Sequence, residues 1–332
     1  MNRRICWCGN HDLLSFNAEY GKCSNCGTLV SVDGLTEQEL QPSGDEEGFY
    51  GKRYWLDHQK KDLGFPDIFA RSRSDLVDRN LYWLKILLKY RLPSAKVLEL
   101  GCSHGSFVRM MRQAGYDASG LELSPWVVEF ARNTFDVPVS MGPIEDLELE
   151  PATLDVVVLM DVLEHLPDPE RTMGHALRLL KPDGLLLVQT PQFNGEGVYE
   201  DLVKSESAFQ GMLRPDEHIY LFTEESARRL FAGLGANHVT FEPAVFYQHD
   251  MFFVVSRQPI VPVESEKATE ALASTPTGRF VQAMLDLDER VKALSEHVKV
   301  IDADRAERLE QIHKLTAMVH EAQGIRGRII GR

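Results

Sequence analysis

Six short apolar runs, separated by amphipathic segments, dominate the stretch from Ala95 to about Gln258. The runs have the length of buried strands and the segments between them the pattern of helices. This alternation is typical of a mostly parallel, doubly wound sheet with helices on both faces. With 332 residues, the chain is long enough for one sizeable α/β domain and additional segments. The runs read KVLEL, DASGLEL, DVVVLMD, GLLLVQT, HVTFEP and MFFVVS.

Charge and hydropathy exclude several classes of protein. A formal net charge of −14 argues against a nucleic-acid-binding surface, because such surfaces usually carry a basic face. No apolar run approaches the ~20 residues that a membrane-spanning helix needs. We therefore expect a cytoplasmic protein with no nucleic-acid partner and no membrane span.

Composition divides the chain into five segments. A cysteine-rich segment covers residues 1–45, and a mainly helical lead-in covers residues 46–94. The α/β domain follows at 95–258. A stretch rich in Pro, Ser, Thr and Glu, residues 259–278, reads as a flexible linker. A helix is expected over residues 279–323.

Apolar residues in this last helix repeat at spacings of four and three, which predicts a coiled-coil seam. The alternative is an amphipathic helix packed on its own domain. The linker in front of the heptads favours self-association or a partner protein. The seam consists of Phe280, Met284, Leu287, Val291, Leu294, Val298 and Ile301, then Arg305 and Arg308, and then Ile312, Leu315, Val319 and Ala322.

The first apolar run ends in a pattern that a buried strand alone does not explain. Glu99 lies two residues before Gly101, and Gly105 follows after Cys-Ser-His. Glycines at a strand-to-helix turn let the backbone approach a ligand, and the first N–H groups of the helix are unpaired. A carboxylate facing that crevice suits a cationic amino-acid cofactor better than a pyrophosphate. The stretch therefore predicts a bound nucleoside of that kind.

Acidic residues also follow the later strands. Glu122 ends the second run, where a carboxylate can accept hydrogen bonds from both hydroxyls of a ribose. Glu145 and Asp146 follow the third strand region, and Asp161 ends the fourth strand. Each alone could be a solvated charge, but their recurrence predicts a cofactor site along one edge of the sheet.

The ordered motifs VLELGCSHG, GLELS, GPIEDL, DVVVLMDVLEHLPDP and LLKPDGLLLVQTP resemble those of class I methyltransferases that use S-adenosylmethionine. The resemblance covers roughly residues 95–257 and implies a seven-stranded sheet whose last strand is antiparallel. It implies that Glu99 and the Gly101–Gly105 loop hold the methionine part, Glu122 the ribose, and Glu145 or Asp146 the adenine. Ser103 stands where the family often has glycine. The expected cofactor-binding residues are Glu99, Gly101, Cys102, Ser103, Gly105, Glu122, Leu123, Glu145, Asp146 and Asp161.

Four of the five cysteines form two close pairs near the N-terminus. The pairs Cys6-Trp-Cys8 and Cys23-Ser-Asn-Cys26 bracket fourteen residues and could meet at a tetrahedral Zn²⁺. The C-x-C spacing is tight, so His11 is an alternative ligand, and ordinary free thiols are the competing interpretation. A four-cysteine ribbon before this core resembles bacterial enzymes that methylate sugars, which implies a structural zinc that shapes the substrate side.

Two pairs of residues could supply a base for the acceptor. The first is Glu164-His165, just after Asp161, and the second is Glu217-His218 in the stretch PDEHIYLFTEES. EHIYLF resembles the Glu-His-x-x-Tyr-Phe stretch that carries the base in sugar C-methyltransferases, although an extra leucine separates its Tyr and Phe. We expect His218 to be the base, oriented by Glu217, with His165 nearby. The alternatives are a histidine that only packs and caps at 165 and a loop histidine without a role at 218.

Both pairs together resemble the metal-binding set of metal-assisted O-methyltransferases. That set would consist of Asp161, Glu164, His165 and His218, with Mg²⁺ or Mn²⁺ bound. Such an ion would lower the pKa of a sugar hydroxyl and position it.

The function predicted from the sequence is transfer of a methyl group to a carbohydrate, either a nucleotide sugar or a surface polysaccharide. A hydroxyl is preferred because a sugar carbon needs an adjacent carbonyl to become nucleophilic. The enzymatic alternatives are C-methylation of a keto-deoxysugar and O-methylation of a small aromatic or quinone-like acceptor. A non-enzymatic alternative is an adaptor that recruits a glycan-assembly partner through residues 280–322.

Overall fold

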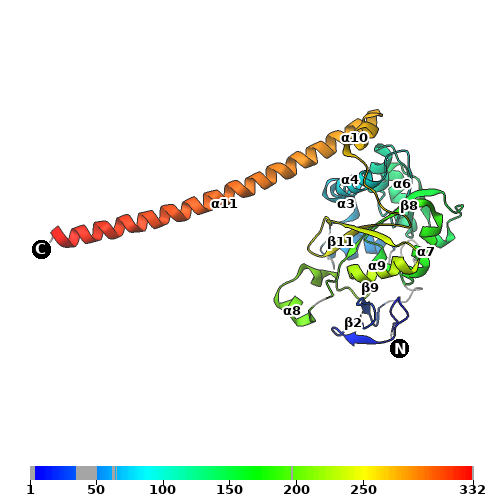
Figure 1. Ribbon diagram of the computed structural model, residues 1–332, viewed down its shortest axis with the longest axis horizontal. Coiled ribbons are helices and arrows are strands. Elements are labelled where there is room, and N and C mark those ends of the chain that lie inside the picture. The colour runs from blue at the N-terminus through cyan, green and yellow to red at the C-terminus, as the bar shows by residue number, and fades with distance from the viewer. Residues whose placement is uncertain (1–3, 35–50, 62–63, 65, 196, 331–332) are drawn as a thin grey trace. The chain divides into compact units, whose positions relative to one another are not determined.

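The computed structural model describes residues 4–34, 51–61, 64, 66–195 and 197–330 (Figure 1). The chain divides into two compact units, Met1–Gln282 and Ala283–Arg332. The predicted boundary between the cysteine segment and the lead-in, at residues 45 and 46, lies outside the described residues.

The centre of the first unit is a seven-stranded sheet of order β10-β11-β8-β7-β4-β5-β6. Strand β11 runs antiparallel to both of its neighbours, and the remaining pairings are parallel. The prediction of a class I methyltransferase sheet with an antiparallel strand DMFFVVS is confirmed. The strands are β4 (Lys96–Leu100), β5 (Asp117–Glu122), β6 (Val139–Met141), β7 (Leu154–Met160), β8 (Leu180–Pro191), β10 (His238–Glu242) and β11 (Asp250–Ser256).

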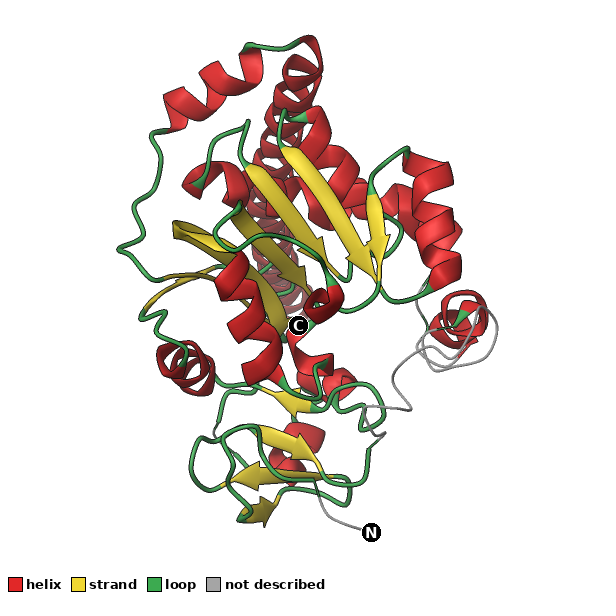
Figure 2. Cartoon of the chain, turned by 90° about the vertical axis from the view of Figure 1, so that its right-hand side faces the viewer, coloured by secondary structure: helices red, strands yellow, loops and turns green. Residues whose placement is uncertain are grey.

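Helices cover both faces of the sheet (Figure 2). On one face α4 (Leu81–Tyr90), α5 (Ser106–Gln113) and α6 (Pro125–Phe135) contact one another in turn. On the other face α7 (Pro169–Leu179) and α9 (Glu224–Gly233) share a buried cluster with Leu98 and Leu100 of β4. Because side chains alternate along a strand, Glu99 faces away from that cluster.

The described residues of the lead-in are mainly helical. It contains α2 (Gln59–Lys61) and α3 (Ile68–Asp75). The Asp67 side chain caps the start of α3 by accepting a hydrogen bond from Ala70 N–H. Two π-helical turns, η1 (Tyr54–His58) and η2 (Leu76–Asn80), adjoin these helices. Such turns are rare and are frequent at functional sites. The remaining short helical elements are η3 (Ile144–Asp146), η4 (Leu163–His165), α8 (Tyr199–Lys204) and η5 (Ala208–Met212).

The N-terminal segment forms a second sheet of order β1-β2-β3-β9. Strands β1 (Leu13–Ser15), β2 (Tyr20–Cys23) and β3 (Leu29–Ser31) are local in sequence. The fourth strand, β9 (Tyr220–Leu221), comes from the α/β domain and pairs antiparallel with β3. The cysteine segment is therefore joined by backbone hydrogen bonds to the residues that directly follow His218.

The C-terminal segments differ from the prediction in one respect. The expected flexible linker contains a helix, α10 (Ser265–Ala273), in which Leu272 is buried. Linker composition was misleading because Ala, Glu and Lys in SEKATEALA favour helix in spite of the prolines and threonines around them. The last helix, α11 (Pro276–Ile330), begins three residues earlier than expected and includes the whole seam. Across the described part of the chain, we find no helix that is both long enough and apolar enough to span a bilayer.

A substitution in the sheet tests this packing. Gly120 of β5 lies against Cys102, and a Cβ at position 120 would approach within 2.8 Å of the Cys102 Cβ and closer still to its Sγ. We predict that Gly120→Ala lowers the free energy of unfolding by about 1–3 kcal/mol through overpacking. Thermal unfolding of the purified chain measures this loss.

The matched control is Gly211→Ala, since a Cβ there meets no atom within 4 Å. Equal stability of the two variants would contradict the close packing of β5 against the loop after β4.

Candidate functional site

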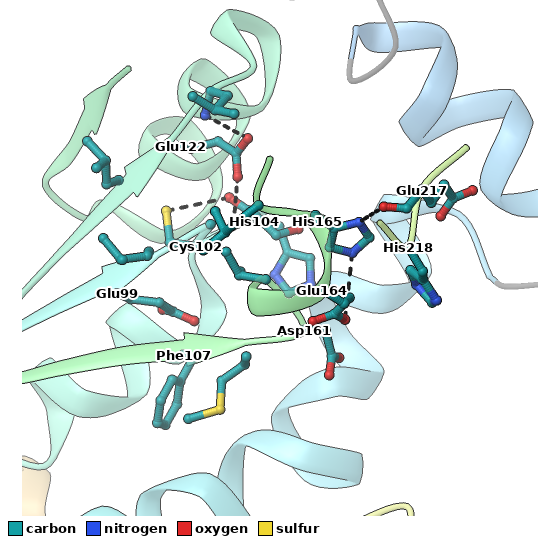
Figure 3. A pocket seen from close by; sticks show the side chains of 18 of the residues that line it. Glu99, Cys102, His104, Phe107, Glu122, Asp161, Glu164, His165, Glu217 and His218 are labelled. Atoms are coloured by element: carbon teal, nitrogen blue, oxygen red, sulfur yellow. Dashed lines mark hydrogen bonds and ion pairs between the residues drawn. The ribbon is translucent and has the colours of Figure 1, made fainter. Parts of the chain in front are cut away.

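A cavity of about 770 Å³ lies at the carboxyl ends of β4, β5 and β7 (Figure 3). The lead-in helices line it, together with the loops after these three strands and the segment 142–146 after β6. Residues of α7, Pro191 and the segments 212–218 and 246–250 complete the lining. In open α/β sheets the crevice beyond the carboxyl ends of the strands is where ligands bind.

The loop after β4 has a tightly constrained backbone. Gly101, Ser103 and Gly105 all have positive φ, at 64°, 48° and 79°. A Cβ at Gly105 would also lie 2.9 Å from Val137 Cγ2, so this glycine is required for packing as well as for the turn. Ser103 adopts a conformation that glycine would adopt without strain, which accounts for the glycine often found there in the family.

Glu99 is the buried carboxyl of this loop that lacks a complete set of partners. Its side chain lines the cavity, the residue is 4% exposed, and Oε2 accepts no hydrogen bond from the described residues. Burial, and then the charge of Glu122, raises the pKa of Glu99 well above its usual value. A cationic amino group would relieve both effects, so the site fits the methionine part of S-adenosylmethionine.

Glu122 ties the loop after β4 to the end of β5. One carboxylate oxygen accepts from Ser103 N–H at 3.0 Å, and the other accepts from Leu123 N–H at 2.9 Å and Ser124 N–H at 3.1 Å. A carboxylate can accept about four hydrogen bonds, so capacity for a ribose hydroxyl remains at the oxygen that Ser103 contacts. Leu123 and Cys102 also line the cavity.

The two acids expected at the adenine differ in their surroundings. Glu145 accepts a hydrogen bond from the Thr172 hydroxyl of α7 at 2.7 Å. Asp146 is exposed, and both residues line the cavity. Of the two, Asp146 is the better placed to accept from an adenine amino group.

Asp161 lies between the cofactor side and the acceptor side. Its carboxylate accepts from Gln189 Nε2 at 2.9 Å and from Arg79 Nη1 at 3.4 Å. Its own φ of 59° is unusual for a residue other than glycine. Asp161 was predicted on the cofactor side, and these contacts make it a link between the lead-in and the sheet.

The charged residues Arg71, Asp75 and Arg79, which the lead-in contributes to the cavity, were not predicted from the sequence. Asp75 is buried and bonded to Arg71 at 3.2 Å, and it lies 3.5 Å from Arg79. Its Oδ2 also lies 3.1 Å from Nε2 of His104, a buried residue of the glycine loop. The spacing of four between Arg71, Asp75 and Arg79 was a visible signal of paired charges on one helical face. Asn80 reaches the same region through Ser106.

The structure brings His165 and His218 together. Their ring centroids are 5.0 Å apart at an interplanar angle of 68°. His165 Nδ1 lies 2.8 Å from the Glu217 carbonyl oxygen, and His218 Nδ1 lies 2.7 Å from the Met212 carbonyl oxygen. Because a carbonyl oxygen only accepts, Nδ1 carries the proton in both rings and Nε2 has the lone pair in the neutral form.

Both imidazoles are kept neutral by their surroundings. Burial lowers the pKa of His165, and burial together with the His165 ring lowers the pKa of His218 well below its usual value. Two neutral rings with Nε2 as the lone-pair atom can accept protons or bind a metal ion.

The prediction that Glu217 orients His218 is wrong. The Glu217 carboxylate lies toward the lead-in, where Oε1 is 2.9 Å from His58 Nε2 and Oε2 accepts from the Tyr54 hydroxyl at 3.3 Å. The side chains of Glu217 and His218 point in different directions, so Glu217 contacts His58 and Tyr54 rather than the His218 ring. Its backbone carbonyl, which the sequence could not reveal, orients His165 instead.

Glu164 completes a group that could hold a metal ion. Ligand atoms of Glu164, His165 and His218 lie within 4.8 Å of one another. Glu164 Oε2 accepts from the Thr190 hydroxyl at 2.8 Å, and Oε1 is 3.7 Å from His165 Nε2. Asp161, the fourth residue of the predicted set, is outside this group and ion-paired with Arg79.

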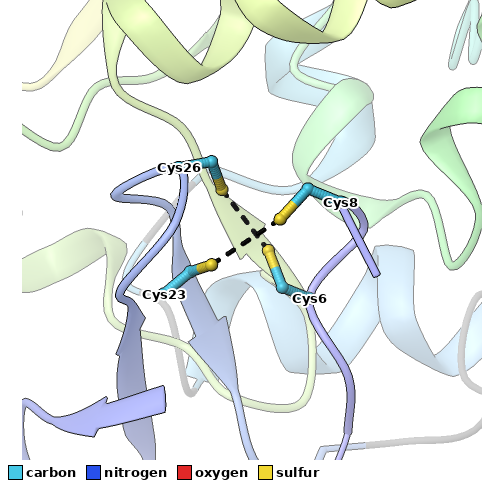
Figure 4. Close-up of side chains that lie close together, drawn as sticks. All are labelled: Cys6, Cys8, Cys23 and Cys26. Atoms are coloured by element: carbon cyan, nitrogen blue, oxygen red, sulfur yellow. Dashed lines mark hydrogen bonds between the residues drawn. The ribbon is translucent and has the colours of Figure 1, made fainter. Parts of the chain in front are cut away.

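The four N-terminal cysteines converge on one point (Figure 4). Cys6 Sγ lies 3.5 Å from Cys26 Sγ, and Cys8 Sγ lies 3.7 Å from Cys23 Sγ. Tetrahedral zinc with Zn–S bonds of about 2.3 Å needs sulfur separations of about 3.8 Å. The cluster is compatible with a zinc site, and the exposed His11 is not part of it.

The cysteine module also holds the segment that carries His218. The buried Tyr20 hydroxyl donates to the His218 carbonyl oxygen at 2.9 Å, and the Ser31 hydroxyl donates to the Pro215 carbonyl oxygen at 2.8 Å. From the opposite side, Ile219 N–H donates to the Glu164 carbonyl oxygen at 2.8 Å. The two histidines are thus positioned relative to each other by backbone hydrogen bonds.

Residues 70–240 match a family model described as a methyltransferase domain. The chain is also similar to the ubiquinone biosynthesis O-methyltransferase of Xanthomonas campestris, with 33% identity over 111 residues, 32% of this chain and 46% of the relative. The enzyme of the same name from Xylella fastidiosa is 34% identical over 105 residues, 30% of this chain and 43% of the relative. The chain therefore spans just under half the length of these relatives.

Among solved structures, the chain resembles the magnesium protoporphyrin IX methyltransferase of Synechocystis. The identity is 21% and the TM-score 0.42, over 56% of this chain and 84% of that one.

Glu99, whose Oε2 has no partner among the described residues, gives a direct test of cofactor binding. A charge-assisted hydrogen bond contributes about 1.5–3 kcal/mol, so Glu99→Gln should weaken S-adenosylmethionine binding roughly 10- to 100-fold. Calorimetry in two buffers of different ionisation enthalpy measures the affinity and the protons exchanged. Because the cation lowers the raised pKa of Glu99, binding to the unchanged protein should release protons and weaken as the pH falls.

Glu148→Gln, at an exposed carboxylate in the same domain, is the control and should bind like the unchanged protein. Unaltered affinity in Glu99→Gln would contradict the placement of the methionine part.

Proposed function

Because the chain belongs to the methyltransferase-domain family, we propose that it methylates a hydroxyl oxygen of a small acceptor that enters beside His165 and His218. The chain is an S-adenosylmethionine-dependent methyltransferase, which confirms the prediction of an enzyme. The position of the hydroxyl and the kind of acceptor are the proposed part.

The histidine pair is the observation that carries the proposal. Transfer of a methyl group to oxygen requires loss of the hydroxyl proton, and a positioned neutral imidazole is the usual acceptor for it. When bound, S-adenosylmethionine supplies an electrophilic methyl group on sulfur. His218 Nε2 would take the proton as the C–O bond forms and the C–S bond breaks, while the Met212 carbonyl keeps the ring in the required tautomer.

The low basicity of the pair favours an acidic hydroxyl. A phenol is a much stronger acid than a simple alcohol, whose acidity is close to that of water. An imidazole whose pKa is lowered by burial is matched more closely to the phenol. Tyr54, Trp55 and Phe246 add aromatic surface to the cavity wall. An aromatic or quinol-type acceptor is therefore our first candidate, and the similarity to ubiquinone biosynthesis O-methyltransferases supports it.

A carbohydrate is the second candidate, and the group of Glu164, His165 and His218 is the observation that favours it. A bound Mg²⁺ or Mn²⁺ there would lower the pKa of an alcohol enough for transfer. The two acceptor classes therefore differ in whether they need an ion.

An assay of acceptors separates the two classes. Purified protein with S-adenosylmethionine would be offered catechols, hydroxylated quinols, nucleotide sugars and lipid-linked glycans, each with a chelator or with added Mg²⁺ or Mn²⁺. Release of S-adenosylhomocysteine and a product heavier by one methylene would be followed by mass spectrometry. We expect turnover of a phenolic acceptor that persists with chelator. Turnover of sugars alone, and only with the ion, would replace the first candidate by the second.

Removal of the proposed base tests the chemistry. General-base catalysis typically contributes 10²–10⁴-fold, so His218→Ala should lower kcat by roughly that factor. The Kd of S-adenosylmethionine should change less than about twofold, because His218 lies on the acceptor side. His238→Ala, at an exposed position of the edge strand β10, serves as the control. A kcat in His218→Ala within threefold of the unchanged enzyme would rule His218 out as the base.

We also propose that the four cysteines hold a structural zinc ion. Its role would be to fix the sheet that carries β9, and through it the backbone at Pro215 and His218. Metal analysis should find about one zinc per chain. Cys23→Ser should lose the zinc and lower kcat while leaving the cofactor Kd nearly unchanged, because the loop after β4 is held by its bond to Glu122 of β5.

Ser24→Ala, in the same turn, is the matched control and should keep both zinc and activity. A zinc-free Cys23→Ser protein with normal kcat would show that the module does not support the catalytic segment.

A further inference from the structure

We propose that α11 pairs with α11 of a second copy of this chain as a parallel, in-register, two-stranded coiled coil. The interaction surface is the seam defined above, from Phe280 to Val319 among the residues whose side chains are described.

The seam is apolar and open to solvent. From Met284 to Ile301 its side chains are between 38% and 64% exposed. Leu315 and Val319 continue it at 61% and 54%. A contiguous row of large apolar side chains at this exposure is typical of an interface.

Pairing also accounts for the length of α11. A helix of 55 residues gains most of its stability from a packed face, because propensity alone is marginal. Its ion pair between Lys314 and Glu310 joins two exposed side chains at a spacing of four and contributes little.

The types of apolar residue select the number and direction of the helices. In heptad notation, Leu287, Leu294 and Leu315 occupy position d. Four of the six a positions from Met284 to Val319 hold β-branched residues, namely Val291, Val298, Ile312 and Val319. β-branched residues at a with leucine at d favour two parallel strands over trimers and tetramers.

Two arginines in the seam specify the register. Arg305 occupies an a position and Arg308 the next d position. Asp304, at the g position beside them, already bonds Arg308 of its own helix at 2.8 Å. In a parallel pair, g flanks the a position of the opposite helix, so Asp304 of each copy would also face Arg305 of the other. In the in-register pair, Asp304 of each copy thus supplies a counter-charge to the seam arginines.

The antiparallel arrangement lacks this match. In an antiparallel pair each a position faces a d position, so full overlap of the seam sets Arg305 opposite Leu294 of the second copy. A buried arginine against leucine has no acceptor for its hydrogen bonds and is costly. One flanking pair also suits the parallel arrangement, since His297 at g would meet Asp302 at the next e position.

The mass of the full chain in solution is the first test. Sedimentation equilibrium should give twice the chain mass of 37.6 kDa. The double variant Leu294→Glu/Val298→Glu should sediment as a monomer, with its catalytic domain still folded by near-ultraviolet circular dichroism. Ala293→Glu, at an exposed position outside the seam, should remain dimeric. A monomeric unchanged chain, a trimer or tetramer, or equal disruption by Ala293→Glu would each overturn the proposal.

Disulfide trapping tests the direction. Leu287→Cys and Ile312→Cys, which would face each other in the antiparallel pair, would be made separately. The unchanged chain would show the background from its own cysteines. After mild oxidation, each variant should form a covalent dimer with itself on a non-reducing gel. Cross-linking only when the two variants are mixed would demonstrate the antiparallel arrangement and overturn the proposal.

Discussion

Two backbone carbonyl groups determine what this site can do. The carbonyls of Met212 and Glu217 accept the Nδ1 protons of His218 and His165, so both rings present their basic nitrogen at Nε2. A segment with little regular structure supplies both carbonyls, and its geometry depends on neighbours. Pairing of β9 with β3 supports it from the cysteine module, and the bond from Ile219 N–H to the Glu164 carbonyl supports it from the sheet. Folding of the N-terminal module and the chemistry of the site are therefore coupled.

Burial of ionisable groups is the second recurring feature. Glu99, Glu164 and Asp250 line one cavity, and burial raises the pKa of each, to about 8 for Asp250. The same burial lowers the pKa of both histidines. A preorganised site of this kind binds ligands that carry a charge or a proton favourably, because folding has already removed water from these groups. A cationic cofactor beside Glu99 and a hydroxyl beside His218 are the ligands that meet these needs.

Much of this could be predicted from the sequence, because the informative patterns are local. Strands such as KVLEL and DVVVLMD are recognised by the length of their apolar runs. Glu99 and Glu122 are recognised by their positions near the ends of strands. The direction of the Glu217 side chain could not be predicted, since it depends on a contact with His58, 159 residues away in the chain. The place of Arg79 in the cavity was missed for a similar reason. It depends on a π-helical turn, which has no clear sequence signature, and on an ion pair with Asp161.

The most direct test of the account is the tautomer of His218. ¹⁵N spectra of histidine-labelled protein, treated with chelator and saturated with S-adenosylhomocysteine, would report which ring nitrogen carries a proton at pH 7. The spectrum of His218→Gln would assign the signals. We predict a neutral ring with Nδ1 protonated and Nε2 unprotonated. A protonated ring, or a neutral ring with the proton on Nε2, would contradict the claim that His218 accepts the hydroxyl proton.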